Sequence, residues 1–178
     1  MFKKIVLLFI IAISFLCAIS VEQEYNQMSN EQKQILIESY EFGKAFNLGY
    51  SLAAIAWQES SCGKYMINLQ DPSAGVYHNN IVSVLNRHGI KDTKWNRNKM
   101  AQKLIDNIEF GAAEALAELE FWQTIHGENN WLLIWQSYNG GFAYMNNFNK
   151  SYKSSYEYSI KIKEKISFLK IIKINVSF

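Results

Sequence analysis

Glu59 is the residue of this sequence best placed for acid–base chemistry. It follows the segment from Leu52 to Trp57, which is apolar on nearly every side and is typical of a buried helix. Two effects there disfavour the charged carboxylate: loss of hydration beside Trp57, and the partial negative charge at a helix C-terminus. A protonated carboxyl in an apolar wall is the general acid that cleavage of a glycosidic bond requires. A glutamate at a solvated helix end is the ordinary alternative.

Other kinds of chemistry have little support in the sequence. The chain has 2 cysteines, and Cys62 is the only one outside the first twenty residues, so no internal disulfide is expected. No histidine stands near Cys62 in sequence to activate it as a nucleophile. His78, His88 and His126 lack the spacing of metal ligands. We therefore expect neither a metal nor a cofactor.

The elements that must position Glu59 are predicted to be helices of one domain. Ser29 to Gln32 reads as a capping box that opens a helix, and a second helix is expected at 51–59. Residues 60–80 are rich in turn-forming types and predict a loop. Apolar spacing predicts further helices at 80–88, 97–106, 107–126, 131–137 and 154–169. The tail 171–178 is left open between a strand, a fraying end and a binding segment. The fold class is all-α.

The first twenty residues have the pattern of a secretory signal peptide. Lys3 and Lys4 precede an apolar run from Ile5 to Leu16, and small residues follow. The run is short for a membrane span, and a retained anchor is the alternative. We expect domains 1–20 (signal) and 21–178 (catalytic, core about 30–168), and location in the periplasm or cell envelope, or secretion. Without Lys3 and Lys4, 16 of the 18 basic residues remain against 16 acidic ones, which argues against nucleic acid as a partner.

Four segments resemble, in order and at the expected spacing, the motifs of lytic transglycosylases with the goose-type lysozyme fold. The family has a helix ending in Glu-Ser, a Gly-Leu-Met-Gln loop, a Gly/Ala-rich helix leading to an Ala-Tyr-Asn-Ala-Gly turn, and a tyrosine early in the last helix. The resemblance covers about residues 30–168. The matching segments are Ala56-Trp57-Gln58-Glu59-Ser60-Ser61, Asp71 to His78, Asn107 to Ala113 with Gln136-Ser137-Tyr138-Asn139-Gly140-Gly141, and Tyr158-Ser159-Ile160-Lys161-Ile162.

The resemblance implies a single lysozyme-like helical domain that acts on peptidoglycan glycan strands as a monomer without a cofactor. Glu59 protonates the glycosidic oxygen between N-acetylmuramic acid and N-acetylglucosamine, and then accepts the proton of the muramic C6 hydroxyl. The product is a 1,6-anhydro sugar. Tyr138 is expected near Glu59, and Gly75 is expected to let the loop backbone approach the saccharide. The implied substrate contacts are Ser60, Ser73, Gly75, Val76, Tyr77, His78, Tyr138, Asn139 and Tyr158.

The sequence departs from the family in the loop and leaves alternatives open. Val76, Tyr77 and His78 replace the usual Leu, Met and Gln, and His78 titrates near neutrality. Asn68 or Ser73 takes the place of a serine that holds the substrate's acetyl group in some members. One rival is a hydrolase with Asp71 as second carboxylate, about 6.5–9.5 Å from Glu59 if it inverts. Another is a peptidoglycan-binding module without catalysis. By analogy, a short exported enzyme of this type fits a secretion or conjugation machine.

Overall fold

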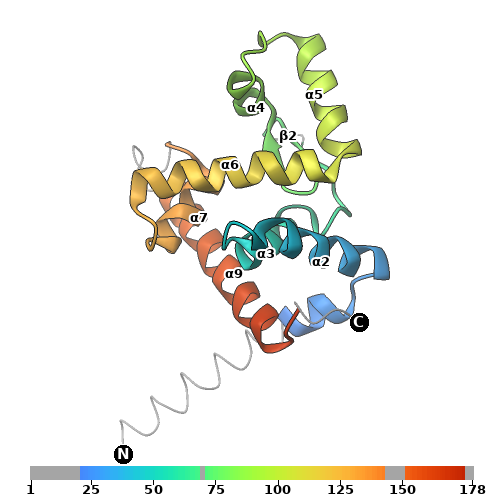
Figure 1. The fold of residues 1–178 in the computed structure, drawn as a ribbon, viewed down its shortest axis with the longest axis vertical. Coiled ribbons are helices and arrows are strands. Elements are labelled where there is room, and N and C mark those ends of the chain that lie inside the picture. The colour runs from blue at the N-terminus through green and yellow to red at the C-terminus, as the bar shows by residue number, and fades with distance from the viewer. Residues whose placement is uncertain (1–20, 69–70, 143–150, 175–178) are drawn as a thin grey trace, which may run out of the picture.

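The computed structural model of the chain describes residues 21–68, 71–142 and 151–174, and these residues are mostly helical (Figure 1). The coarse prediction of a helical protein is therefore confirmed. The predicted signal segment, residues 1–20, lies outside the described residues. Among the described helices, none combines the length and the apolar character that a membrane span requires.

The helix that carries Glu59 near its C-terminus is positioned by its partner. Helix α2 (Asn30–Lys44) begins at the predicted capping box, in which the Ser29 side chain accepts from the backbone of Gln32. Helix α3 (Gly49–Ser60) follows after a short turn. The two helices approach closely, because a Cβ on Gly43 would come within 2.8 Å of the Leu48 backbone. Helix α3 is buried over nearly its whole length, as its composition predicts.

The segment predicted as a loop contains a small antiparallel sheet. Strands β1 (Ile67–Asn68), β2 (Ser73–Ala74) and β3 (Asn79–Asn80) pair in the order β1-β2-β3. Ala74 stands opposite Ile67 in one pairing and opposite Asn79 in the other. The prediction of a loop without strands was wrong here, because strands of two residues are too short to show an alternating pattern.

The remaining helices follow the predicted order with shifted ends. They are α4 (Ile81–Arg87), α5 (Lys94–Asp106), α6 (Ile108–His126), α7 (Trp131–Gly140) and α9 (Ser151–Ile171). Helix α5 begins three residues before the predicted start because Thr93 caps it, its side chain accepting from Asn96 at 3.1 Å. Asn107 caps α6 in the same way, at 2.8 Å from the Phe110 nitrogen.

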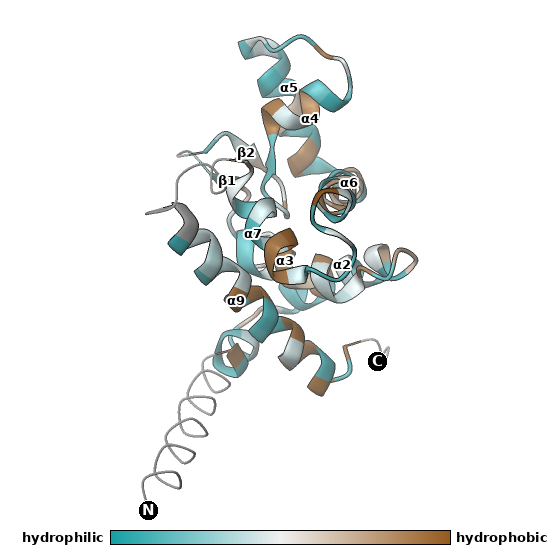
Figure 2. Ribbon diagram, turned by 90° about the vertical axis from the view of Figure 1, so that its left-hand side faces the viewer, coloured by the Kyte–Doolittle hydropathy of each residue, from teal (hydrophilic) through white to brown (hydrophobic). Residues whose placement is uncertain are grey.

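Buried apolar side chains form two clusters on opposite sides of α6. The larger joins α2, α3, α6, α7 and α9, and the smaller joins β2, α4 and α5. In Figure 1, α4 and α5 accordingly lie above α6, while α2, α3 and α9 lie below it. Figure 2 shows α3 as an apolar helix in the interior, whereas α5 is largely hydrophilic. The body that carries Glu59 and the α4–α5 unit thus have separate apolar clusters.

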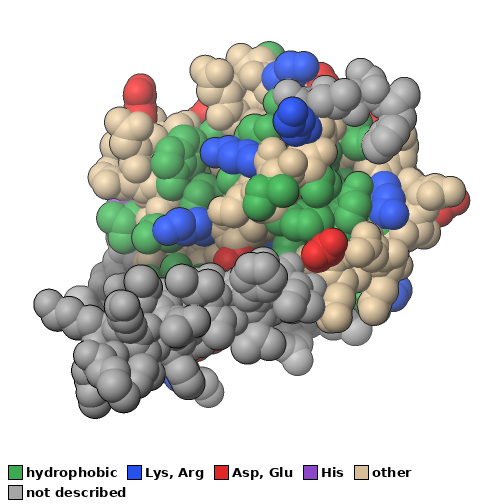
Figure 3. Space-filling view, turned by 90° about the horizontal axis from the view of Figure 1, so that it is seen from below, with side chains coloured by type: hydrophobic (Ala, Val, Ile, Leu, Met, Phe, Trp, Pro, Cys, Tyr) green, Lys and Arg blue, Asp and Glu red, His purple; other side chains and the backbone are tan. Residues whose placement is uncertain are grey.

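The chain before α2 also belongs to the packed body. Residues 21–26 are helical, and Val21 is buried in the larger cluster. Glu24 pairs with Lys165 of α9 at 3.1 Å, and the ring of Tyr25 lies 5.4 Å from that of Phe168. Seen from below, this end of the molecule carries apolar side chains in the middle of the face with basic side chains among them (Figure 3). Packing therefore extends beyond the range 30–168 covered by the resemblance.

Candidate active site

A polar cleft of about 280 Å³ opens at the end of α3. One wall comes from the small sheet and α4, and the other comes from α6 and α7. Three carboxylates reach it, those of Glu59, Asp71 and Glu118. The lining residues are Glu59, Asn68, Asp71, Ser73, His78, Asn79, Asn80, Ser83, Arg87, Glu118, Ser137, Tyr138, Asn139, Gly140 and Gly141.

Glu59 lies in the last turn of α3 with its side chain 15% exposed. The helix ends at Ser60 because Ser61 and Cys62 adopt positive φ angles of 50° and 53°. Their backbone N–H groups bond to the carbonyls of Trp57 and Ala56, which would otherwise be left without partners. The carboxyl group therefore projects from a rigid, buried helix into the cleft.

His78 holds both Glu59 and the neighbouring loop. Its Nδ1 lies 3.3 Å from Oε2 of Glu59, and its Nε2 lies 2.7 Å from the carbonyl oxygen of Tyr65. Burial lowers the pKa of His78, but the hydrogen bonds to Glu59 and Tyr65 and the charges of Glu59 and Asp71 outweigh burial, so this pKa is raised. The sequence singled out His78 as a departure from the family, and the structure places it against the predicted acid.

Ser60 joins α3 to the loop rather than facing the cleft. It is fully buried, and its hydroxyl donates to the carbonyl of Val76 at 2.6 Å while accepting from the Gly63 nitrogen at 2.8 Å. The resemblance implied that Ser60 contacts the substrate. Its hydrogen bonds indicate instead that it fixes the loop relative to Glu59. Val76 itself is buried in the larger apolar cluster.

Gly75 is required by the protein's own packing. Its φ is +83°, a conformation that side chains disfavour, and a Cβ would lie 2.5 Å from the carbonyl oxygen of Leu104 in α5. Its nitrogen donates to the Met66 carbonyl at 2.8 Å. Among the described residues, Gly75 is not part of the cleft lining. The Gly75 backbone, which was expected to approach a saccharide, instead approaches Leu104 of α5.

We expect Gly75→Ala to lower the free energy of unfolding by about 3 kcal/mol, because backbone strain adds to a steric clash. For a chain of this size the melting temperature should fall by about 6–12 °C. Gly89→Ala is the matched control, since Gly89 also has a positive φ (+63°) but open space where its Cβ would stand. Equal losses in the two variants, measured by thermal unfolding, would show that the contact with Leu104 is unimportant.

Two tyrosines support the floor of the cleft. Tyr77 is fully buried, and its hydroxyl lies 2.9 Å from Oγ of Ser39. Tyr138, which lines the cleft, donates its hydroxyl to the Tyr77 carbonyl at 3.0 Å. Burial raises the pKa of Tyr138 well above its usual range, and the nearby charge of Glu59 adds to this effect. Tyr138 thus lines the same cleft as Glu59, while Tyr77, which the resemblance implied as a substrate contact, is buried and does not line the cleft.

Tyr158 approaches Glu59 from α9. It is buried, and its hydroxyl makes no hydrogen bond of ordinary geometry among the described residues. Burial raises the pKa of Tyr158 well above its usual range, and the adjacent Glu59 carboxylate contributes. Asn139 lines the cleft, and its side-chain oxygen accepts from Ser155 of α9 at 3.3 Å. Ser73 and Asn68, the two nominees for holding an acetyl group, also line the cleft.

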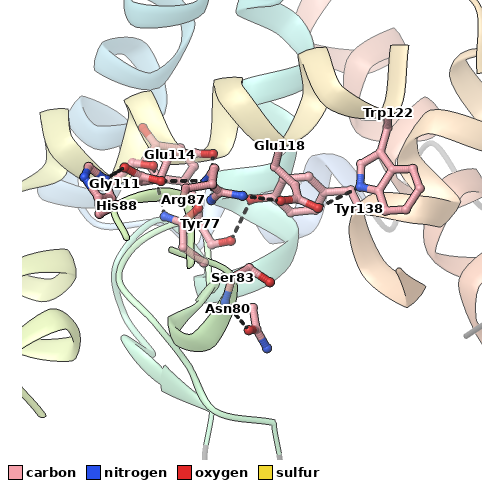
Figure 4. A network of polar contacts seen from close by, with 11 residues as sticks. Tyr77, Asn80, Ser83, Arg87, His88, Gly111, Glu114, Glu118, Trp122 and Tyr138 are labelled. Atoms are coloured by element: carbon pink, nitrogen blue, oxygen red, sulfur yellow. Dashed lines mark hydrogen bonds and ion pairs between the residues drawn. The ribbon is translucent and has the colours of Figure 1, made fainter. Parts of the chain in front are cut away.

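A charged network in the cleft wall was missed by the sequence reasoning (Figure 4). Glu114 of α6 is buried and accepts from Nε of Arg87 at 2.9 Å and from Nε2 of His88 at 2.6 Å. Glu118, one turn further along α6, accepts from Arg87 at 2.6 Å and from the indole of Trp122 at 2.8 Å. A glutamate among the alanines of an apolar helix was the available signal, since such a charge is rarely buried without a partner.

A second hollow of about 420 Å³ lies between residues 21–32, the end of α3 and α9. This hollow is larger, but its lining includes neither Glu59 nor Tyr138 nor Tyr158. Its Lys165 is paired with Glu24. We therefore place the candidate site at the smaller cleft. Burial raises the pKa of the Cys62 thiol to about 12, which does not suit a nucleophile. Within the described ranges, no three His, Cys, Asp or Glu side chains are grouped to hold a metal ion.

Comparisons with known proteins identify no relative of this chain, so the site is described from its geometry alone. No family model matches the chain, and neither curated proteins nor solved structures give a significant match.

Proposed function

We propose that this chain is an exported peptidoglycan lytic transglycosylase of the goose-type lysozyme fold, with Glu59 as its catalytic acid and base. The observation that carries the proposal is the surroundings of Glu59. Residues from all four motif segments, far apart in sequence, gather at this one carboxyl group. His78 contacts it, Tyr138 lines the same cleft, and Tyr158 approaches it from α9.

The proposed reaction needs one protein carboxylate, and Glu59 supplies it. Glu59 protonates the glycosidic oxygen between N-acetylmuramic acid and N-acetylglucosamine, and the substrate's acetamide stabilises the positive anomeric carbon. Glu59 then accepts the proton of the muramic C6 hydroxyl as that oxygen closes the 1,6-anhydro ring. One proton is given and one is taken, so Glu59 ends the cycle as it began. No metal or cofactor takes part in this scheme.

A lysozyme-type hydrolase is the second candidate, because other carboxylates line the same cleft. Asp71 accepts from the Asn80 side chain at 3.3 Å, and Glu118 is bound by Arg87 and Trp122. Glu118 is therefore committed to structure, which leaves Asp71 as the group that would activate water. The conformation of Glu59 favours neither product, so the product itself must be identified.

The test is digestion of purified murein with the chain from Val21 onward, followed by mass spectrometry of the released fragments. Anhydromuropeptides are expected. Fragments with reducing ends would replace the proposal with a hydrolase. Binding of murein without release of fragments would replace the proposal with a peptidoglycan-binding module. The glycan strand is the partner in each of these three outcomes.

We expect Tyr158→Phe to separate stability from activity. The substitution removes a buried hydroxyl that makes no hydrogen bond of ordinary geometry within the described part of the chain, so the melting temperature should stay the same or rise slightly. Release of anhydromuropeptides should fall by about tenfold or more, because the hydroxyl beside Glu59 is lost from the reacting centre. Unchanged release at unchanged stability would exclude Tyr158 from the site.

A further inference from the structure

We propose that His78 is a positioning residue that shares one proton with Glu59 and delivers it when substrate closes the cleft. The role of His78 in catalysis rests on the proposed function, whereas the proton shared with Glu59 is inferred from the geometry of the two side chains. In the family that the sequence resembles, the loop residue at this place is a glutamine, which cannot carry a proton. The pairing is thus a property of this chain.

The two contacts of the imidazole ring determine where its protons lie. A carbonyl oxygen only accepts, so the 2.7 Å contact with Tyr65 requires a hydrogen on Nε2. The other nitrogen, Nδ1, faces Oε2 of Glu59 at 3.3 Å. If neither group carried a proton there, a lone pair would face a carboxylate. The contact is therefore favourable with one shared proton, held either by Nδ1 beside a carboxylate or by Glu59 beside a neutral ring.

The loop holds the ring in this position at some cost to its backbone. His78 has a φ of +45°, which is uncommon for a residue with a side chain, and its nitrogen donates to the Gly75 carbonyl at 3.2 Å. Residues on either side are fixed by the β2–β3 pairing. The side chains of His78 and Glu59 are only 10% and 15% exposed, so few water molecules compete for the proton.

Several charged or titratable groups surround the pair; the carboxylates favour a retained proton, whereas the cation Arg87 has the opposite sign and is bound by Glu114 and Glu118. Asp71 raises the pKa of His78 together with Glu59, whereas burial opposes them. The tyrosines beside Glu59 have raised pKa values and remain neutral. The groups of the surrounding elements are Asp71 before β2, Tyr77 between β2 and β3, Arg87 of α4, Glu118 of α6, Tyr138 of α7 and Tyr158 of α9.

Substrate binding moves the shared proton toward the carboxyl group. An ion pair is stabilised by water, so excluding water from the cleft favours the neutral arrangement, in which the proton passes from Nδ1 to Oε2. Glu59 then protonates the glycosidic oxygen and regains a proton from the C6 hydroxyl. That proton returns to Nδ1 when water re-enters. Throughout, the hydrogen on Nε2 stays with the Tyr65 carbonyl.

The direct test follows the imidazole nitrogens by NMR in chain labelled with ¹⁵N-histidine, with His78→Gln used to assign the signal. We expect His78 to titrate above its ordinary value of 6.5, and to titrate lower in Glu59→Gln because the carboxylate that stabilises the charged ring is removed. Asp71→Asn is the matched control and should lower it less. The neutral ring should carry its hydrogen on Nε2. Identical titration in the native chain and Glu59→Gln, or a neutral ring protonated on Nδ1, would overturn the pairing.

The second test measures murein cleavage against pH. Activity of the native chain should fall as pH rises through the raised pKa of His78, because the pair then loses its proton. In His78→Gln the fall should begin at lower pH, with a loss of about tenfold for each pH unit between the two limits. His88→Gln should keep the native limit. An unchanged limit in His78→Gln would overturn proton delivery. A native chain that never cuts murein would overturn the proposed function, while the NMR titration still decides the pairing.

Discussion

Glu59→Gln should reduce the release of anhydromuropeptides by at least about 10³-fold. Glutamine keeps the shape of the side chain but has no proton to give, and general acid–base catalysis by one group contributes about 10²–10⁴-fold. Here a single carboxyl serves both as acid and as base, so both contributions disappear together. The measurement is the initial rate of fragment release, quantified by mass spectrometry, at equal protein concentration.

Two controls make the result of Glu59→Gln specific. The variant should still sediment with murein, because the cleft and its other polar groups are unchanged. Glu41→Gln should retain native activity, since Glu41 is half-exposed on α2 and pairs only with Lys44 at the surface. Residual cleavage by Glu59→Gln within about tenfold of the native rate would mean that another group supplies the proton.

Glu114→Gln should lower the free energy of unfolding by about 2 kcal/mol, because the partly exposed Arg87 and His88 lose the buried carboxylate that binds both of them. Glu114 accepts from both Arg87 and His88, and an amide offers only one acceptor atom to the two donors. The melting temperature should fall by about 4–8 °C in thermal unfolding. Because Arg87 lines the cleft, its loosened guanidinium should also weaken sedimentation with murein.

Glu120→Gln is the appropriate comparison for Glu114→Gln. Glu120 lies on the same helix but is exposed, so its substitution should change the free energy of unfolding by less than about 0.5 kcal/mol. If both variants melted together with the native chain, the buried network would contribute nothing net to stability. The Arg87 and His88 contacts would then serve only to shape the cleft.

The helices were predictable because their signals are local. Ser29 with Gln32 and Asn107 with Phe110 mark helix starts through bonds that span three residues, and the structure contains both. The position of Glu59 at the end of a buried helix was predictable as well, since the apolar run before it is continuous; its role as an acid stays a prediction. The clustering of motif residues around Glu59 could be predicted only from the resemblance, because neither composition nor periodicity relates Glu59 to Tyr158.

What escaped prediction depends on contacts between distant segments. Gly75 is required because Leu104 approaches its Cα closely, and Ser60 is buried because its hydroxyl donates to the Val76 carbonyl. Neither partner can be identified from spacing. The sheet of two-residue strands is held by pairing across turns rather than by a run of β-forming residues. The Arg87–Glu114 pair spans 27 positions of sequence, which is beyond any helical period.

The division of the apolar residues into two clusters has a consequence for how this protein can evolve. Glu59 belongs to the body built on α3, whereas Asn80, Ser83 and Arg87 reach the cleft from the unit built on α4 and α5. Substitutions that repack this smaller unit can reshape one side of the cleft, provided that they keep the close approach of Leu104 to Gly75. Under the proposed function, selection can therefore change which substrates the cleft binds while Glu59 keeps its role.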